Sequence, residues 1–365
     1  MLQKLYRLRN NLMKKEDGKL KVLVANLAET RQKDIDRGRG LIAEHFRAKI
    51  DVLPWKLDAN FEWTKDNIIK SMADQFDMPS WAWHALENGR EINKEIEKYR
   101  DNFIYQIKGC NINCPWCYVD EINKNGLPGD YSEWFSIPEI IDTFEKTRAE
   151  RKNSKEGELN RIRPSGGEAT IVIEQWLENL KELEKRNLSK EIFVQNDSNL
   201  TTGHFLDDLE RKGEIEPNIL QKIGEYKNLG LLASFKGTDE KNFTENTRAD
   251  GKLIEESIYS FKKYVKAGID TYPFFYNPNP DTLESFLERL AKEVGDNVFL
   301  KSRVFRLKIY DPLKLRFGSQ EKVEAYIKEL NENYLKAEEK MREIMHKKFG
   351  LEYKSGLRVG IKLGN

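Results

Sequence analysis

The chain has 365 residues, enough for one large α/β domain or two domains of ordinary size, and its 39% hydrophobic content can still fill a barrel-sized core. Its 62 Lys and Arg and 61 Asp and Glu residues leave a net charge of +1, which argues against a dedicated nucleic-acid-binding surface. The first residues lack the apolar core of a signal peptide, and no uncharged run could cross a bilayer. We therefore expect a cytoplasmic protein without a membrane span.

Residues 1–100 show mostly helical patterning with one expected strand at 21–27, and we interpret them as an accessory, mainly helical N-terminal extension. The segment 37–40, Arg-Gly-Arg-Gly, follows no expected strand, so we interpret it as a turn and not as a phosphate-binding loop. Several large aromatic residues either pack on the main domain or form a wall of a substrate cavity: Trp55, Phe61, Trp63, Phe76, Trp81 and Trp83.

An expected strand at 103–107 leads directly into a loop that holds the three cysteines of the chain, Cys110, Cys114 and Cys117. Thiolates are the soft ligands that iron–sulfur clusters select, and three of them can hold three corners of a four-iron cluster. Because the chain has no other cysteine, the fourth iron would keep an open position, as a catalytic zinc ion does. The alternatives are a disulfide, which would leave one cysteine over, and a zinc site, for which no histidine is adjacent.

From residue 103 onward, short apolar runs alternate with helical stretches, a pattern typical of a parallel α/β sheet. After the first strand, we expect strands at 161–165, 191–196, 231–236, 271–276 and within 298–310. We expect helices at 137–151, 174–187, 216–227, 255–267, 281–294 and 320–348. Six such units are too few for a closed eight-stranded barrel and predict a partial (β/α)6 TIM-like barrel. The expected domains are an accessory region at 1–100, the barrel at 101–310 and a C-terminal helical extension at 311–365.

Polar residues follow the second, third and fourth of these strands, at the carboxyl ends where parallel barrels bind ligands. Gly166 and Gly167 let the backbone approach a ligand, and Glu168 adds a fixed negative charge, although such a turn is also common in loops. Asn196, in a polar run at 195–199, can bind ribose or carboxylate groups, or cap the loop as an Asx turn.

After the fourth strand, Ser234 can hydrogen-bond to a ribose hydroxyl, and Lys236 can neutralise a carboxylate at the barrel mouth. The sixth strand region carries several charged or phenolic side chains that would lie at the barrel rim or on an exposed strand edge. These are Arg303, Arg306, Lys308 and Tyr310.

The spacing Cys-x3-Cys-x2-Cys, with Trp116 before the last cysteine, resembles the signature of the radical S-adenosylmethionine (SAM) enzymes. The run Gly166–Glu168 resembles the GGE motif of that family. The polar run at 195–199 resembles the Thr-Asn-Gly turn of radical activating enzymes, with Asp197 in place of the glycine. The stretch from Ser234 to Lys236 is similar to one in glycyl-radical activating enzymes, with the serine where those enzymes have an acid.

This resemblance implies a radical SAM oxidoreductase in which the three cysteines bind a [4Fe–4S] cluster and SAM chelates the open iron. An external electron donor of the flavodoxin or ferredoxin type would reduce the cluster. Cleavage of SAM would give a 5′-deoxyadenosyl radical that abstracts hydrogen from an unidentified substrate, with a protein or peptide among the candidates. A non-catalytic zinc-binding interaction module is the alternative. The implied SAM-binding residues are Trp116, Gly166, Gly167, Glu168, Asn196, Ser234 and Lys236.

Overall fold

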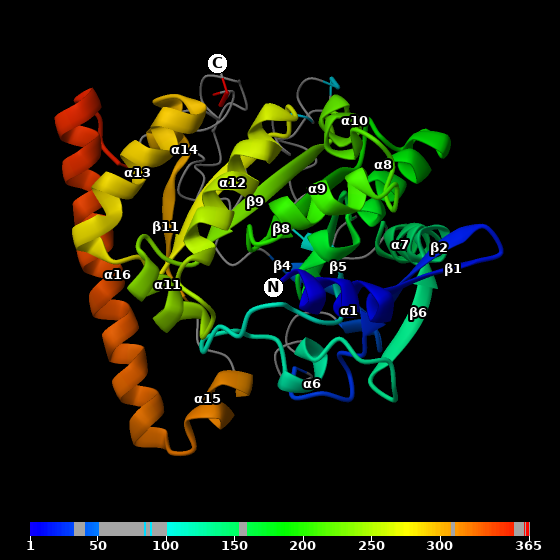
Figure 1. Cartoon of the computed structure of the whole chain (residues 1–365). Helices are drawn as coiled ribbons and strands as arrows, with labels where there is room; N and C mark the ends of the chain where they lie inside the picture. The colour runs from blue at the N-terminus through cyan, green and yellow to red at the C-terminus, as the bar shows by residue number, and fades with distance from the viewer. Residues whose placement is uncertain are drawn as a thin grey trace.

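A parallel half-barrel forms the centre of the molecule. The computed structural model describes residues 1–32, 41–50, 84, 88–89, 101–152, 159–307, 311–353, 361 and 363–364. Within these residues, six strands pair side by side in chain order, and each neighbouring pair is parallel. The strands are β5 (Asp101–Ile107), β7 (Arg161–Gly166), β8 (Phe193–Ser198), β9 (Leu229–Phe235), β10 (Thr271–Tyr276) and β11 (Arg303–Phe305). Their order confirms the predicted partial barrel (Figure 1).

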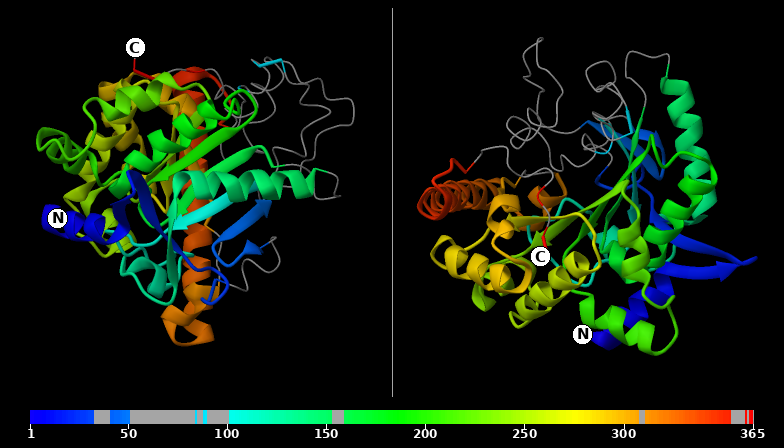
Figure 2. Two further views of the ribbon diagram at one scale, coloured as in Figure 1. Left: turned by 90° about the vertical axis from the view of Figure 1, so that its right-hand side faces the viewer. Right: turned by 90° about the horizontal axis from the view of Figure 1, so that it is seen from above.

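Helices connect these strands and cover the outer face of the sheet. Figure 2 shows them, from green to orange, as an arc around the strands. The first of them begins at a capping box, in which Ser136 and Glu139 satisfy each other's backbone, with a proline in the first turn. The helices are α7 (Ile137–Arg151), α8 (Glu174–Lys185), α9 (Gly203–Arg211), α10 (Ile219–Glu225), α11 (Glu240–Thr247), α12 (Leu253–Lys266), α13 (Pro280–Val294) and α14 (Asn297–Lys301).

An aromatic layer joins the sheet to two of these helices. Phe235 of β9 stacks on Phe275 of β10, with ring centroids 5.3 Å apart. The same ring meets Phe261 of α12 and Phe286 of α13 edge-on. Every residue of β9 is buried, as expected for a parallel strand covered on both faces. This layer fixes the carboxyl ends of the strands, and so the loops that follow them, on a rigid base.

The N-terminal residues extend the sheet with antiparallel strands. The expected strand at 21–27 is confirmed as β2, and both β2 and β4 pair with β5. The sequence predicted one strand here, whereas the described part contains four. The short strands β1 and β3 were missed because they carry no clear alternation of apolar and polar residues. The elements are α1 (Leu2–Leu12), β1 (Met13–Glu16), β2 (Lys19–Ala25), β3 (Leu41–Ala43), β4 (Phe46–Ile50) and, later in the chain, α6 (Glu121–Lys124) and β6 (Ser132–Ser136).

Some residues singled out in this region lie outside the described residues. These are the segment 37–40 and the aromatic residues Trp55, Phe61, Trp63, Phe76, Trp81 and Trp83.

The C-terminal part begins with the sixth strand. The strand expected within 298–310 is confirmed as β11 (Arg303–Phe305), and the first residues of that range belong to helix α14. Arg306 lies beyond the strand, is exposed and reaches Asn331, so it does not line a strand face. Lys308 and Tyr310 lie outside the described residues.

Two further helices follow, α15 (Asp311–Phe317) and α16 (Gln320–Phe349), and α16 packs on α13. The predicted helix at 320–348 is confirmed as α16. None of the helices in the described residues is long and apolar enough to cross a bilayer.

Candidate functional site

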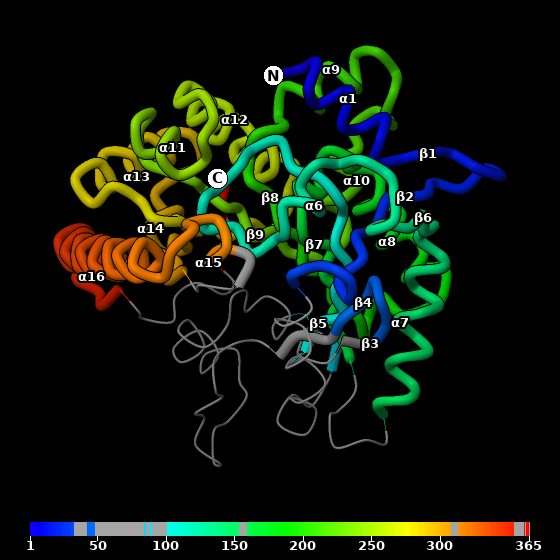
Figure 3. The backbone as a smooth tube through the Cα atoms, turned by 90° about the horizontal axis from the view of Figure 1, so that it is seen from below, coloured from blue at the N-terminus to red at the C-terminus, as the bar shows by residue number. Residues whose placement is uncertain are grey.

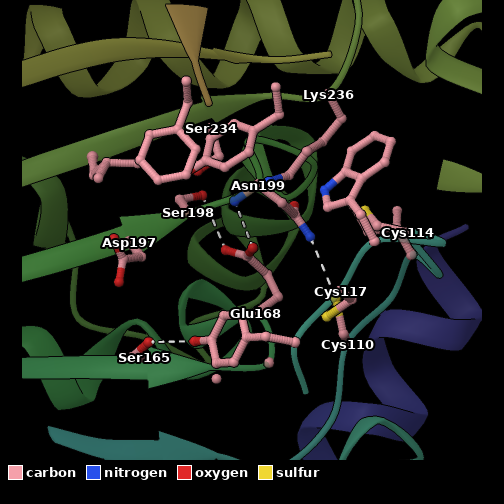
Figure 4. Close-up of a pocket in the computed structure, with 18 of the residues that line it drawn as sticks. Cys110, Cys114, Cys117, Ser165, Glu168, Asp197, Ser198, Asn199, Ser234 and Lys236 are labelled. Atoms are coloured by element: carbon pink, nitrogen blue, oxygen red, sulfur yellow. Dashed lines mark hydrogen bonds between the residues drawn. The ribbon is translucent and has the colours of Figure 1, made fainter. Parts of the chain in front are cut away.

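A cavity at the carboxyl ends of the parallel strands brings together most of the side chains singled out in the sequence (Figure 4). The cysteine loop lines one end, and residues that follow β7, β8 and β9 line the rest. Asn196 is not part of this lining. The predicted residues that line the cavity are Cys110, Cys114, Trp116, Cys117, Gly166, Gly167, Glu168, Ser234 and Lys236.

Backbone hydrogen bonds hold the cysteine loop against the helix α6. The N–H of Gly109 donates to the carbonyl of Asn123 at 2.7 Å, and that of Cys110 to the carbonyl of Lys124 at 3.1 Å. A turn then closes the loop, because the N–H of Cys117 donates to the carbonyl of Cys114 at 3.1 Å. These hydrogen bonds set the path of the loop between β5 and α6.

Apolar side chains pack around the thiols, and Cys114 is buried among them. Cys114 and Trp116 pack in a small cluster with Ile112 and with Leu313 of α15, while Cys110 lies at its edge. Burial raises the pKa of Cys114 to about 11, and burial together with the charge of Glu168 raises the pKa of Cys110 to about 12. These thiols are therefore protonated near neutral pH without a metal, and metal binding must release their protons.

The donor set fits a [4Fe–4S] cluster. Three soft cysteine thiols, Cys110, Cys114 and Cys117, line one end of a single cavity and could each bind a different iron, which leaves the fourth iron open. Across the described ranges, no three Cys, His, Asp or Glu side chains surround one point where a single metal ion would sit. Ligands of a cluster need no such common point, because they bind different irons.

The Gly-Gly-Glu turn packs directly on the cysteine loop. The N–H of Gly167 donates to Ile107 O and that of Glu168 to Gly109 O, both at 2.9 Å. A Cβ on Gly167 would lie 1.7 Å from the Gly109 carbonyl oxygen, and Gly166 has a φ of +98°. Both glycines therefore allow the Gly-Gly-Glu turn to pack closely on the start of the cysteine loop, in addition to any role in contacting a ligand.

Glu168 is a buried carboxylate that joins two loops. One of its oxygens accepts from the hydroxyls of Thr170 and Ser198, the latter at 3.0 Å, and the other from the N–H of Asn199 at 2.6 Å. Burial raises the pKa of Glu168, although these donors oppose the shift by stabilising the anion. Glu168 lines the cavity, and the oxygen that accepts from Asn199 has a second lone pair for a further donor.

The loop after β8 reaches the cysteines through Asn199. Its side-chain amide lies 3.6 Å from the sulfur of Cys110 and donates to Asn111 at 3.0 Å. Asn196 is fully buried on the other face of β8, since strand residues alternate and Asp197 lines the cavity. The sequence reasoning included Asn199 in the polar run but did not select it. Its position two residues after Asp197, which lines the cavity, would have been the available signal, because alternate residues share one strand face.

Lys236, at the end of β9, stands over an aromatic ring at the edge of the cavity. Its ammonium lies 3.8 Å from the ring centroid of Tyr276 in β10, a cation–π geometry that holds the charge near Cys114. Ser234, two residues earlier on the same strand face, lines the cavity beside it.

A group of polar side chains in the cavity lining was missed by the sequence reasoning. Arg163 and Asp197 form a two-point ion pair at 2.8 and 2.9 Å, and the hydroxyls of Tyr118 and Ser165 lie 2.9 Å apart. Figure 4 shows Asp197 and Ser165 away from the cysteines. Alternation along β7 was the available signal, because it puts Arg163 and Ser165 on one face.

The C-terminal helix α15 clamps the cysteine loop through one arginine. The guanidinium of Arg316 donates to the carbonyl of Pro115 at 3.3 Å and to the carbonyls of Cys117 and Val119. It also lies 2.5 Å from a carboxylate oxygen of Glu121. Figure 3 shows α15 beside the loop that follows β5. No sequence motif marks this contact.

The sequence model of the radical SAM superfamily matches residues 104–290, just over half of the chain. The chain belongs to the radical SAM superfamily. Members of this superfamily use a [4Fe–4S] cluster and SAM, so those are its cofactors. No curated protein matches the chain.

Several solved structures are similar at low identity. A spore photoproduct lyase variant has 12% identity and a TM-score of 0.34, covering 51% of this chain and 50% of that one. A TYW1 structure with a lysine-pyruvate adduct bound has 15% identity and a TM-score of 0.41, covering 82% and 88%. A structure of anSMEcpe with bound AdoMet has 16% identity and a TM-score of 0.34, covering 56% and 50%. The chain thus spans about half the length of the first and third of these proteins.

Proposed function

We propose that this radical SAM enzyme binds its cluster through Cys110, Cys114 and Cys117 and holds SAM between the cysteine loop and the ends of β7, β8 and β9. The observation that carries the proposal is that the three thiols, Glu168 and Lys236 line one cavity. When bound, the cluster and SAM supply a one-electron cleavage that yields a 5′-deoxyadenosyl radical for hydrogen abstraction.

The residues of the chain bind and orient SAM in this proposal. Glu168 accepts from the SAM ammonium through the oxygen that also accepts from the N–H of Asn199, a charge-assisted hydrogen bond. Lys236 neutralises the SAM carboxylate, and Trp116 packs near the adenine. Ser234 is proposed to hydrogen-bond to SAM. For Asn196 the same role stays a prediction from the sequence, because its side chain is fully buried and outside the cavity lining.

The substrate occupies the end of the cavity away from the cysteines, where Tyr118, Ser165 and the pair Arg163–Asp197 provide polar groups. The resemblance of the run from Ser234 to Lys236 to activating enzymes makes a peptide or a protein the first substrate class to test. In this proposal the oxidoreductase acts as an activating enzyme and receives its electron from a flavodoxin- or ferredoxin-type protein.

The test is anaerobic reconstitution with iron and sulfide. We expect about four irons and four sulfides per chain, a visible absorption that bleaches with dithionite, and formation of 5′-deoxyadenosine and methionine from added SAM. A colourless protein that carries one zinc ion per chain and leaves SAM intact would instead support the non-catalytic zinc-binding module.

A Lys236→Met variant is expected to bind SAM more weakly while its melting temperature changes little. The methionine keeps the apolar stem over Tyr276 and removes the charge that the SAM carboxylate would meet. The loss should be up to about 1 kcal/mol, or about fivefold, and should shrink at high salt because the partly exposed site is open to ions. SAM titrations at low and high salt measure it, with Lys241→Met, whose side chain is 87% exposed, as the control.

A further inference from the structure

A groove on the surface of the molecule also reaches the cysteine loop. Residues of α1 at helical spacing, on one face of the helix, form one wall. The helix α6 and the turn after it form the other wall, and Figure 1 shows α6 beside α1. Cys110, Ile112 and Asn113 form the floor. The groove is lined by Lys4, Arg7, Leu8, Asn11, Cys110, Ile112, Asn113, Glu121, Lys124, Asn125 and Leu127.

The charge of this groove is positive although the whole chain is nearly neutral. Lys4 is exposed and donates to the backbone carbonyl of Asn111, at 2.7 Å, inside the cysteine loop. Arg7, one turn further along α1, is exposed and has no ion pair or hydrogen bond with the described residues. The carboxylate of Glu121 is shared by two cations, Lys124 at 2.7 Å and Arg316 at 2.5 Å, so it does not cancel the groove's charge.

Exposed apolar side chains gather at the same place. In the described residues, five large hydrophobic side chains are exposed, and two of them lie at or beside this groove. Leu127 lines it and is 54% exposed, and Met1 has its sulfur 4.0 Å from the amide of Asn111. An exposed apolar group within a polar rim is a common mark of a protein-binding surface.

We infer that this groove is the docking site of a small acidic electron-carrier protein. The inference rests on the proposed function, since it takes Cys110 in the groove floor as a ligand of the cluster. A partner seated between Arg7 and Leu127 would place its redox centre next to the loop that holds the cluster. One electron then passes from the reduced carrier, which is oxidised, to the oxidised cluster, which is reduced. Positive charge at the rim attracts the acidic carrier and orients it.

The test compares two charge-reversing variants of the reconstituted full chain. Arg7→Glu reverses a charge at the groove, and Lys190→Glu reverses one on an exposed residue before β8, at the opposite, amino end of the parallel strands. The affinity for an oxidised acidic ferredoxin is measured by calorimetry at low and high salt. The rate of cluster reduction by the reduced ferredoxin is measured by stopped-flow, and reduction by dithionite is measured beside it.

Arg7→Glu should weaken ferredoxin binding and slow its electron transfer by about tenfold at low salt, and much less at high salt. Lys190→Glu should stay within about twofold of the wild type, and dithionite should reduce all three proteins fully. Leu127→Gln should weaken binding at both salt concentrations, because it removes an apolar contact.

Equal ferredoxin affinities for Arg7→Glu and Lys190→Glu would overturn the inference. It would also be overturned if a single-stranded RNA, in place of ferredoxin, bound in an Arg7-dependent manner. Failure of the proposed function has a different signature, namely a protein that leaves SAM intact even with dithionite. Ferredoxin binding measured by calorimetry does not depend on SAM cleavage, so the two outcomes stay separate.

Discussion

Cys114→Ala is expected to abolish SAM cleavage. The variant leaves two thiols, Cys110 and Cys117, to hold a four-iron cluster, and the chain has no other cysteine to replace the lost ligand. The reconstituted variant should lose most of its iron and its visible absorption. We expect 5′-deoxyadenosine formation to fall below about a thousandth of the wild-type rate, a loss of more than about 4 kcal/mol in barrier terms.

The folded state should survive this change, which separates a ligand role from a packing role. Cys114 is buried beside Trp116 and Leu313, and loss of its sulfur leaves a small cavity that costs roughly 1 kcal/mol. Ile112→Val removes one methylene from the same cluster at a similar cost and keeps all three thiols. Melting temperatures of the two cluster-free variants should be alike, while only Ile112→Val binds iron. Wild-type iron content in Cys114→Ala would contradict the ligand role.

Glu168→Ala is expected to weaken SAM binding and to lower stability together. The variant removes the proposed partner of the SAM ammonium, worth roughly 1.5–3 kcal/mol, or about ten- to a hundredfold in affinity. It also leaves the hydroxyl of Ser198 and the N–H of Asn199 buried without their acceptor, at about 1–3 kcal/mol each. Isothermal titration with SAM and thermal unfolding measure the two effects.

Glu174→Ala is the matched control for the loss of stability. Glu174 is a partly buried carboxylate that pairs with Arg9 of α1 at 2.9 Å and lies outside the cavity lining. Its loss should lower the melting temperature and leave SAM affinity unchanged. If the two variants bound SAM equally well, Glu168 would be a structural link between the loops and no more.

The sequence predicts the parallel half-barrel well because its signals are local. The helix Ile137–Arg151 is marked by a capping box and a proline, and the strand Thr271–Tyr276 is a short aromatic run. Local signals fail where pairing with a neighbouring strand decides whether a segment becomes a strand. The strand Met13–Glu16 reads Met-Lys-Lys-Glu and exists because it pairs with β2. Within 298–310, where a strand was expected with no definite span, the described residues that form one are Arg303–Phe305, which pair with β10.

The proximity of the site residues is predictable for a different reason. Cys110, Cys114 and Cys117 are neighbours in the sequence, and the carboxyl ends of parallel strands bring Glu168 and Lys236 to the same edge. The contacts that hold these loops together are tertiary, and no local sequence motif predicts them. The acceptor role of Glu168 toward Asn199 depends on two loops meeting, and the pair Arg163–Asp197 depends on strand register.

The contact of Arg316 with the cysteine loop joins two segments that are synthesised at different times. Arg316 contacts the carbonyl of Cys117 across 199 positions of sequence, so the ribosome releases the cysteine loop long before the helix that secures it. The nascent loop therefore lacks the clamp from α15 while most of the chain is synthesised. Iron and sulfide delivered before that helix emerges would meet an incompletely shielded loop.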